Sequence, residues 1–252
     1  MMTPQPISRA LTYPLLIAFL RTFMAVLPGI LLVEDRVDIS FALVLLLLYL
    51  LLSEFFQVFI QRANANGQSL SLNLYVGKVV IGIICIWIIT NKLAPQYGII
   101  LLMYEVFQFF IFSEKYNYQE TLLYTCLNAF FKGIVFNLII SIHYPYSFKA
   151  FYFWSYLFSF LIVLIGTLLT QSLYAKGGRN SDFNRLSFIS FLILMGYLAY
   201  QVYAKHLIWL LLLPMIAVIF LAAWFIIRHN NQKKRELTLN AALLLLLLIY
   251  YI

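Results

Sequence analysis

The chain has 252 residues, of which 64% are hydrophobic and only 10% are charged, and its formal net charge is +8 at pH 7. These values exclude a soluble globular domain and predict an all-α polytopic membrane protein, because so little charge cannot cover a water-exposed surface. The excess of positive charge does not require nucleic acid as a partner, since basic loops beside anionic lipid head groups account for it. We expect one transmembrane domain, residues 1–252, without a soluble module.

Apolar windows long enough to cross about 30 Å of hydrocarbon recur along the chain. They predict about nine transmembrane helices, near residues 12–33, 40–61, 74–90, 95–113, 120–141, 150–174, 186–203, 206–227 and 238–252. Polar segments separate these windows, for example residues 34–38 after the first and 176–180 after the sixth. The first window lacks a small-residue cleavage site behind it, so we expect it to be a retained helix.

Lys and Arg in the short loops predict the orientation of the chain. With the N-terminus inside, the inner loops hold most of the basic residues: Arg9, Arg62, Lys115, Lys176, Arg179, Arg185, Arg228, Lys233, Lys234 and Arg235. The outer loops hold Arg36, Lys92, Lys149 and Lys205. This asymmetry predicts a multi-pass plasma-membrane protein with a cytoplasmic N-terminus and an extracytoplasmic C-terminus.

Polar side chains return at the end of the second predicted helix, in residues 53–64 (SEFFQVFIQRAN). Glu54, Gln57 and Gln61 share one helical face, because residues three and four apart point the same way. The spacing resembles the first aspartate-rich motif of the UbiA superfamily of intramembrane prenyltransferases, N-D-x-x-D-x-x-x-D-R-x-N. Arg62 and Asn64 match that motif outright.

The resemblance keeps the spacing of the motif but not its acidic residues. Ser53 and Glu54 stand at the positions of its Asn and first Asp, while Gln57 and Gln61 replace the two metal-binding Asp residues. In the family these carboxylates hold Mg²⁺, which binds the diphosphate of an isoprenyl donor. An amide oxygen brings no negative charge to the hard cation, so the resemblance implies that this site holds no metal.

The second family motif should follow the sixth predicted helix, where this chain reads GTLLTQSLYAKGGRNSDF from Gly166 to Phe183. No Asp or Glu occurs between Glu120 and Asp182, and Thr170, Gln171 and Tyr174 occupy the region of the family's aspartates. The basic continuation from Lys176 to Arg179 remains. We expect Asp182 to be the N-cap of the next helix. We expect this second stretch to face residues 53–64 across a central cavity.

Three basic residues, Arg21, Lys78 and Lys132, lie within the predicted spans. A charge deep in a bilayer is costly and usually faces a cavity or a counter-charge, so Arg21 and Lys132 are candidate cavity residues. Glu54 and Glu105 are the candidate counter-charges. Lys78 lies near a helix start and is expected to reach the interface instead.

The resemblance implies a UbiA-like bundle over nearly the whole chain. The chain is similar to the UbiA-like proteins found in Gram-positive loci for flavin-based extracellular electron transfer. That likeness implies a non-catalytic protein without a resident cofactor, which binds menaquinone or a polyprenyl lipid, or which scaffolds membrane electron-transfer proteins. The predicted binding residues are Arg21, Glu54, Gln57, Gln61, Arg62, Asn64, Lys132, Asn137, Tyr174 and Arg179.

Two other functions stay open on the sequence. Arg21, Arg62, Lys132 and Arg179 could hold a diphosphate without metal, which would make the chain an active polyprenyltransferase of quinone biosynthesis with an altered site. A small transporter is the third reading, although the sequence has no broken-helix repeat to support it. A disulfide between Cys85 and Cys126 is neither required nor excluded by the sequence.

Overall fold

The computed structural model describes residues 7–33, 40–65, 72–93, 95–112, 118–143, 153–175 and 179–252. Within these ranges the chain is helical and forms no β-strand. The long helices are α1 (Ile7–Leu31), α2 (Phe41–Ala65), α3 (Leu72–Lys92), α4 (Pro95–Phe112), α5 (Leu122–Phe130), α6 (Phe136–His143), α7 (Leu157–Tyr174), α8 (Arg179–Tyr203), α9 (Leu212–Arg228) and α10 (Gln232–Tyr251). Shorter helical segments are η2 (Tyr118–Glu120), η3 (Phe131–Val135), η5 (Phe153–Tyr156) and η6 (Trp209–Leu211).

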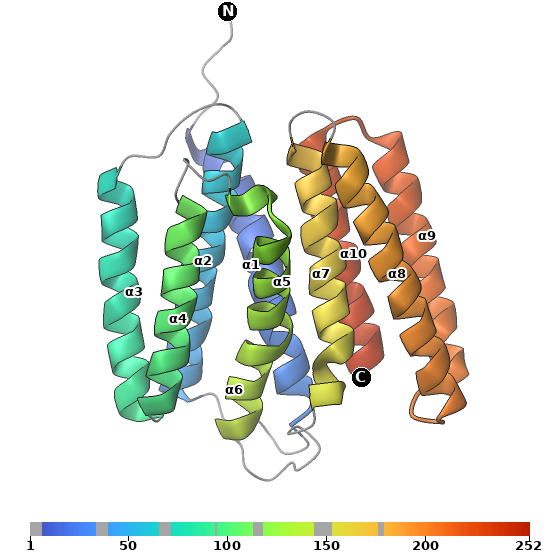
Figure 1. Ribbon diagram of the computed structural model, residues 1–252, viewed down its shortest axis with the longest axis horizontal. Helices are drawn as coiled ribbons and strands as arrows, with labels where there is room; N and C mark the ends of the chain where they lie inside the picture. Colours follow the sequence, from blue (N-terminus) through green and yellow to red (C-terminus); the bar gives the residue numbers. More distant parts are fainter. Residues whose placement is uncertain are drawn as a thin grey trace, which may run out of the picture.

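The helices run up and down through one bundle (Figure 1). The carboxyl ends of α2 and α7 lie at the same end of the bundle as the amino ends of α1, α5 and α10, at the top of the view. This end therefore collects the polar residues that close α2 and α7 and those that open α10.

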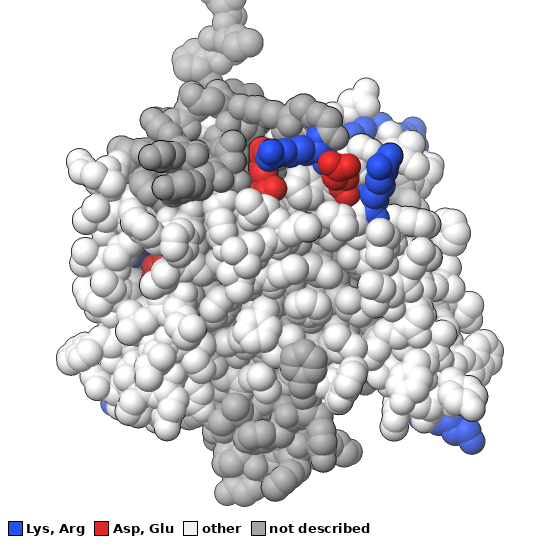
Figure 2. Space-filling model, in the orientation of Figure 1, with Lys and Arg blue, Asp and Glu red and all other residues white. Residues whose placement is uncertain are grey.

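Seven helical runs of the described chain are long and apolar enough to cross a membrane, one of them the continuous run through α5, η3 and α6. The segment Pro95–Ile111 of α4 is apolar but shorter. A helix satisfies its backbone hydrogen bonds internally, which a segment in hydrocarbon must do. Large apolar side chains such as Trp87, Phe220 and Ile227 are exposed on the bundle surface, as lipid-facing residues would be. On the face shown in Figure 2 the charged side chains gather mainly at one end of the bundle. The protein is thus a polytopic helical membrane protein.

Two hydrophobic clusters hold the bundle together. The first surrounds Tyr104, Phe107 and Phe136 and contains residues of every helix from α1 through α6. The second surrounds Phe158 and Leu247 and contains residues of every helix from α7 through α10. Helix α1 packs into both clusters, so the boundary between the clusters runs along α1. The candidate site lies on this boundary.

Helices α8 and α10 begin six or more residues earlier than the sequence predicted. Helix α8 begins at Arg179 rather than near 186, so Asp182 lies in its first turn and is not the N-cap. A carboxylate there still favours the helix, because the amino end carries partial positive charge. Helix α10 begins at Gln232 rather than near 238, and the side chain of Asn231 caps it by accepting a hydrogen bond from the Lys233 amide at 3.0 Å.

A π-helical segment, η3, joins α5 to α6. Its wider turn frees backbone carbonyls, and Asn137 Nδ2 donates to two of them, Lys132 O at 3.1 Å and Gly133 O at 3.0 Å. Asn137 Oδ1 accepts from the Gly29 amide at 2.8 Å. Asn137 was predicted as a ligand-binding residue, but the structure makes it a bridge between α6 and α1. Single π-helical turns often mark functional sites, and this one carries Lys132.

Gly133 sets the distance between η3 and α7. A Cβ atom at this position would lie 2.5 Å from the Phe160 Cα atom, which is backbone and cannot move aside. We expect Gly133→Ala to lower the free energy of unfolding by about 1–3 kcal/mol through overpacking. Thermal unfolding in detergent measures this loss.

The matched control for that substitution is Gly196→Ala in α8. A Cβ atom there meets nothing within 4 Å. The control is expected to be neutral or to gain up to about 1 kcal/mol, because alanine favours a helix over glycine. An equal melting temperature for both variants would show that the crossing at Gly133 tolerates a methyl group.

Candidate functional site

Lys132 is buried at the centre of the bundle, with 3% of its surface exposed. Its ammonium group forms an ion pair with Glu54 and donates a hydrogen bond to Gln57 Oε1 at 2.7 Å. Glu54 and Gln57 lie one turn apart on α2, which is why both reach the same cation. Glu54 Oε2 and Gln57 Nε2 find no partner among the described residues. The π-helical segment therefore places one cation against the polar face of α2.

Glu236 of α10 joins three other helices. Its carboxylate accepts from Arg21 Nη2 at 3.0 Å, from Arg62 Nη2 at 3.3 Å and from the Tyr174 hydroxyl at 2.7 Å. Arg21 also donates to Asn240 Oδ1 at 3.3 Å. The Glu236 side chain is only 1% exposed. One buried carboxylate thus ties α1, α2 and α7 to α10.

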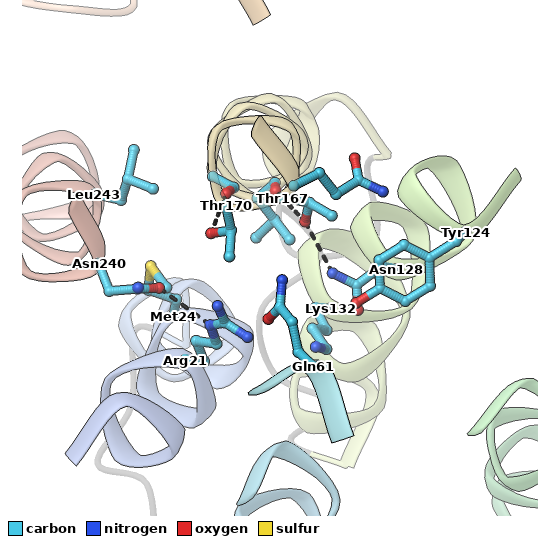
Figure 3. Close-up of a pocket in the computed structure, with 13 residues that line it drawn as sticks. Arg21, Met24, Gln61, Tyr124, Asn128, Lys132, Thr167, Thr170, Asn240 and Leu243 are labelled. Carbon is cyan, nitrogen blue, oxygen red and sulfur yellow. Dashed lines mark hydrogen bonds between the residues drawn. The ribbon is translucent and has the colours of Figure 1, made fainter. Parts of the chain in front are cut away.

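A cavity lies between Lys132 and Arg21 (Figure 3). It is lined by Arg21, Met24, Gln61, Tyr124, Asn128, Lys132, Val163, Gly166, Thr167, Thr170, Gln171, Asn240 and Leu243. Its volume is about 40 Å³ for the centres of water molecules, which is room for roughly three waters. Gln61 and Arg21 are only partly buried, so the cavity is not sealed.

The two stretches that the sequence singled out face each other across this cavity. Gln61 comes from residues 53–64 of the chain, and Thr167, Thr170 and Gln171 come from the stretch that starts at Gly166. The Gln61 side chain points toward α7 in Figure 3, and Arg21 approaches from α1, while the Lys132 ammonium is turned toward Glu54 and Gln57 of α2. Gln171 itself is fully engaged, since it accepts from Thr125 at 2.9 Å and donates to Gln119 O at 2.6 Å.

The predicted binding residues divide into three groups. Arg21, Gln61 and Lys132 line the cavity. The others that lie nearby contact these cavity residues or Glu236 and are Glu54, Gln57, Arg62 and Tyr174. Asn137 does not line the cavity but donates to the backbone carbonyl of Lys132.

Arg179 was predicted at the site but does not line the cavity. It pairs with Glu120 at 3.0 Å on the surface, and its side chain is 60% exposed. The reason is that α8 begins at this residue and directs it toward η2 and solvent. The side chain of Asn64 and residues 176–178 lie outside the described part of the chain.

Three residues of the site were missed on the sequence. Glu236 precedes the predicted start of the last helix and was assigned to a loop, and Asn240 lies one turn after it. Asn128 lies four residues before Lys132 on the same helical face, and that spacing could have revealed it. With Glu236 included, the cluster holds three cations, Arg21, Arg62 and Lys132, and two carboxylates, so its net charge is +1.

Lys78 does not reach the interface, contrary to the prediction. It is 2% exposed and donates to both carboxylate oxygens of Glu105 on α4, at 2.7 and 2.6 Å. The residue lies two turns inside α3, facing α4, so its side chain meets Glu105 instead of water. Cys85 and Cys126 are both free.

Both carboxylates of the site are already neutralised by basic partners. Among the described residues, no group of three or more His, Cys, Asp or Glu side chains converges. Comparison with known proteins returns no matching family model, no matching curated protein and no matching solved structure. The geometry and charge of the cavity are therefore the basis for inferring the function.

Proposed function

We propose that this protein is a non-catalytic, UbiA-like membrane protein that binds the head group of a quinone or isoprenoid lipid in the cavity between α2 and α7. The observation that carries the proposal is the set of hydrogen-bond donors around this cavity, Arg21, Lys132 and Gln61. With a cluster charge of +1, the site favours a head group that accepts hydrogen bonds, such as a quinone carbonyl or a lipid phosphate.

The proposed topology has nine spans. Helix α4 and helix α10 add to the seven helices that meet the length and hydropathy of a span. By the positive-inside rule, the basic residues at the end that carries Arg62, Arg228 and Lys233 favour a cytoplasmic position for this end. The cavity then opens toward the cytoplasmic side of the plasma membrane, with the C-terminus outside.

The size of the cavity decides which part of the ligand it can hold. About 40 Å³ accommodates the oxygen-bearing edge of a head group but not a polyprenyl chain. The tail lies among the aromatic side chains of the helices or in the surrounding lipid. A protein that holds a quinone in this way can serve membrane electron-transfer partners without making a bond itself.

The first test measures stabilisation by ligand. A short-chain menaquinone analogue or a polyprenyl phosphate should raise the melting temperature in detergent. At a ligand concentration 100 times the Kd, the free energy of unfolding should rise by about 2.7 kcal/mol. Lys132→Ala should weaken this response. Because that change leaves the buried Glu54 carboxylate without its cation, it can also destabilise the fold. The double variant Lys132→Met/Glu54→Gln removes both charges, so a weaker response in this variant reports lost ligand binding.

The control for the binding test is Lys233→Met, an exposed residue of α10 that should leave the response unchanged. A melting temperature indifferent to every such ligand would favour a scaffolding role. A response that persists without both Lys132 and Arg62 would place the lipid site elsewhere in the bundle.

The second test concerns catalysis. The purified chain should not transfer a polyprenyl group to dihydroxynaphthoate or hydroxybenzoate in a Mg²⁺-dependent reaction. Gln57 and Gln61 offer no charge to the metal, and Glu54 and Glu236 are held by Lys132, Arg21 and Arg62. Product formation that EDTA abolishes would instead establish the alternative function, an active polyprenyltransferase.

A metal-independent transfer would also support that alternative. Arg21 and Lys132 line the same cavity and could bind a diphosphate directly. Assays with and without EDTA therefore distinguish the three cases: no product, a metal-dependent product, and a product that needs no metal.

A further inference from the structure

Asn128, which lines the cavity, carries a buried side-chain oxygen that accepts no hydrogen bond from the described residues. The residue is 5% exposed and lines the cavity. Its Nδ2 atom donates to Thr167 Oγ1 at 2.9 Å, while its Oδ1 atom has no partner among the described residues. A buried acceptor without a donor is unfavourable, so it marks a place where a donor is expected.

The orientation of the Asn128 amide is fixed by Thr167. The Thr167 hydroxyl donates its single hydrogen to the Val163 carbonyl at 2.8 Å. It can therefore only accept from Asn128, which requires the amide nitrogen to face Thr167. The amide oxygen therefore points away from Thr167 and stays without a donor, and a flip of the side chain would place two acceptors against each other.

Other residues that line the cavity supply donors. Lys132 and Arg21 are cationic, and the Gln61 amide makes no hydrogen bond to the described residues. A ligand that satisfies the whole site therefore both accepts and donates hydrogen bonds at the edge that enters the cavity. A quinone carbonyl only accepts, whereas the hydroxyl of a quinol also donates.

We propose that this cavity distinguishes the redox forms of its ligand and holds the quinol in preference to the quinone, with the quinol hydroxyl donating to Asn128 Oδ1. This inference depends on the proposed lipid-binding function and specifies which form is bound. The quinone brings its carbonyl against the Asn128 oxygen and leaves that acceptor unpaired. The expected preference is about tenfold in affinity.

A preference for the quinol changes the potential of the bound couple. For a two-electron couple, a tenfold tighter binding of the reduced form raises the midpoint potential by about 30 mV. The protein then makes its bound quinone easier to reduce than the quinone free in the membrane. This effect needs no catalytic group from the chain.

The test uses two compounds that do not change redox state. 4-Methoxy-1-naphthol keeps one hydroxyl and one ether oxygen, and 1,4-dimethoxynaphthalene replaces that hydroxyl with a second ether. Isothermal titration of the detergent-solubilised protein should show the naphthol binding about tenfold more tightly. Asn128→Leu should remove this difference, because no acceptor remains.

Thr170→Val is the matched control in the same cavity. Its hydroxyl is already used on the Gly166 carbonyl at 2.7 Å, so the preference for the naphthol should persist. A poised-electrode titration with menadione adds a second measurement, a midpoint shift of about +30 mV with the wild type that Asn128→Leu abolishes. If Asn128→Leu does not fold, the difference in affinity of the wild type for the two naphthalene compounds still tests the redox preference.

Other outcomes overturn specific claims. Equal affinity for both naphthalene compounds refutes the redox preference and leaves lipid binding intact. No binding of either compound or of menadione, with polyprenyl phosphate still bound, overturns the quinol and identifies the head group as a phosphate. No binding of any of them overturns the proposed function itself.

Discussion

Glu236→Gln is expected to lower the free energy of unfolding by about 3–5 kcal/mol, because it removes the anion that faces two largely buried guanidinium groups. Arg21 and Arg62 both donate to this carboxylate, and their side chains are only 12% and 15% exposed. The glutamine keeps the shape of the side chain and one carbonyl acceptor for Tyr174, so the loss reports the charge. Thermal or chemical unfolding in detergent measures it.

The matched control is Glu120→Gln, which removes the carboxylate of an exposed pair. The Arg179 side chain opposite it is 60% exposed, and such pairs contribute about 0–1 kcal/mol. Similar losses in the two variants would contradict the view that Glu236 ties four helices together. Loss of Glu236 also raises the cluster charge from +1 to +2, so the less stable variant should gain affinity for an anionic polyprenyl phosphate.

Apolar periodicity predicted the helices well, because a backbone in hydrocarbon has few choices besides a helix. It misplaced the amino ends of α8 and α10, where charged residues belong to the helix. Residues 232–236 read QKKRE, a polar run that resembles a loop although its residues favour a helix. That misplacement hid Glu236, which is the main counter-charge of the site.

Contacts between helices were harder to predict than the helices themselves. The sequence indicated Glu54 and Glu105 as counter-charges for the deep cations Arg21 and Lys132. Glu54 does pair with Lys132, but Glu105 pairs with Lys78, and Arg21 pairs with Glu236. It could not show that Asn137 would satisfy the π-helical turn, since nothing in the sequence announces that turn. A polar residue in a membrane helix thus predicts a partner, while the partner's identity depends on how the helices pack.

The pair between Lys78 and Glu105 gives the second large effect. Lys78→Met should lower stability by about 3–5 kcal/mol, because it leaves the Glu105 carboxylate buried between α3 and α4 without its cation. Both side chains are less than a tenth exposed, at 1% and 9%. Among the described residues, no basic side chain other than Lys78 pairs with Glu105.

The double variant Lys78→Met/Glu105→Leu should recover most of that loss. Replacing a whole buried ion pair with apolar residues of similar size is often neutral or stabilising, since neither charge then has to be removed from water. The two changes should therefore be strongly non-additive in a double-mutant cycle. Additive losses would mean that the two side chains act on stability separately. Because only Glu105 and Lys78 change, and neither lines the cavity between α2 and α7, the double variant should also keep the ligand response of the wild type.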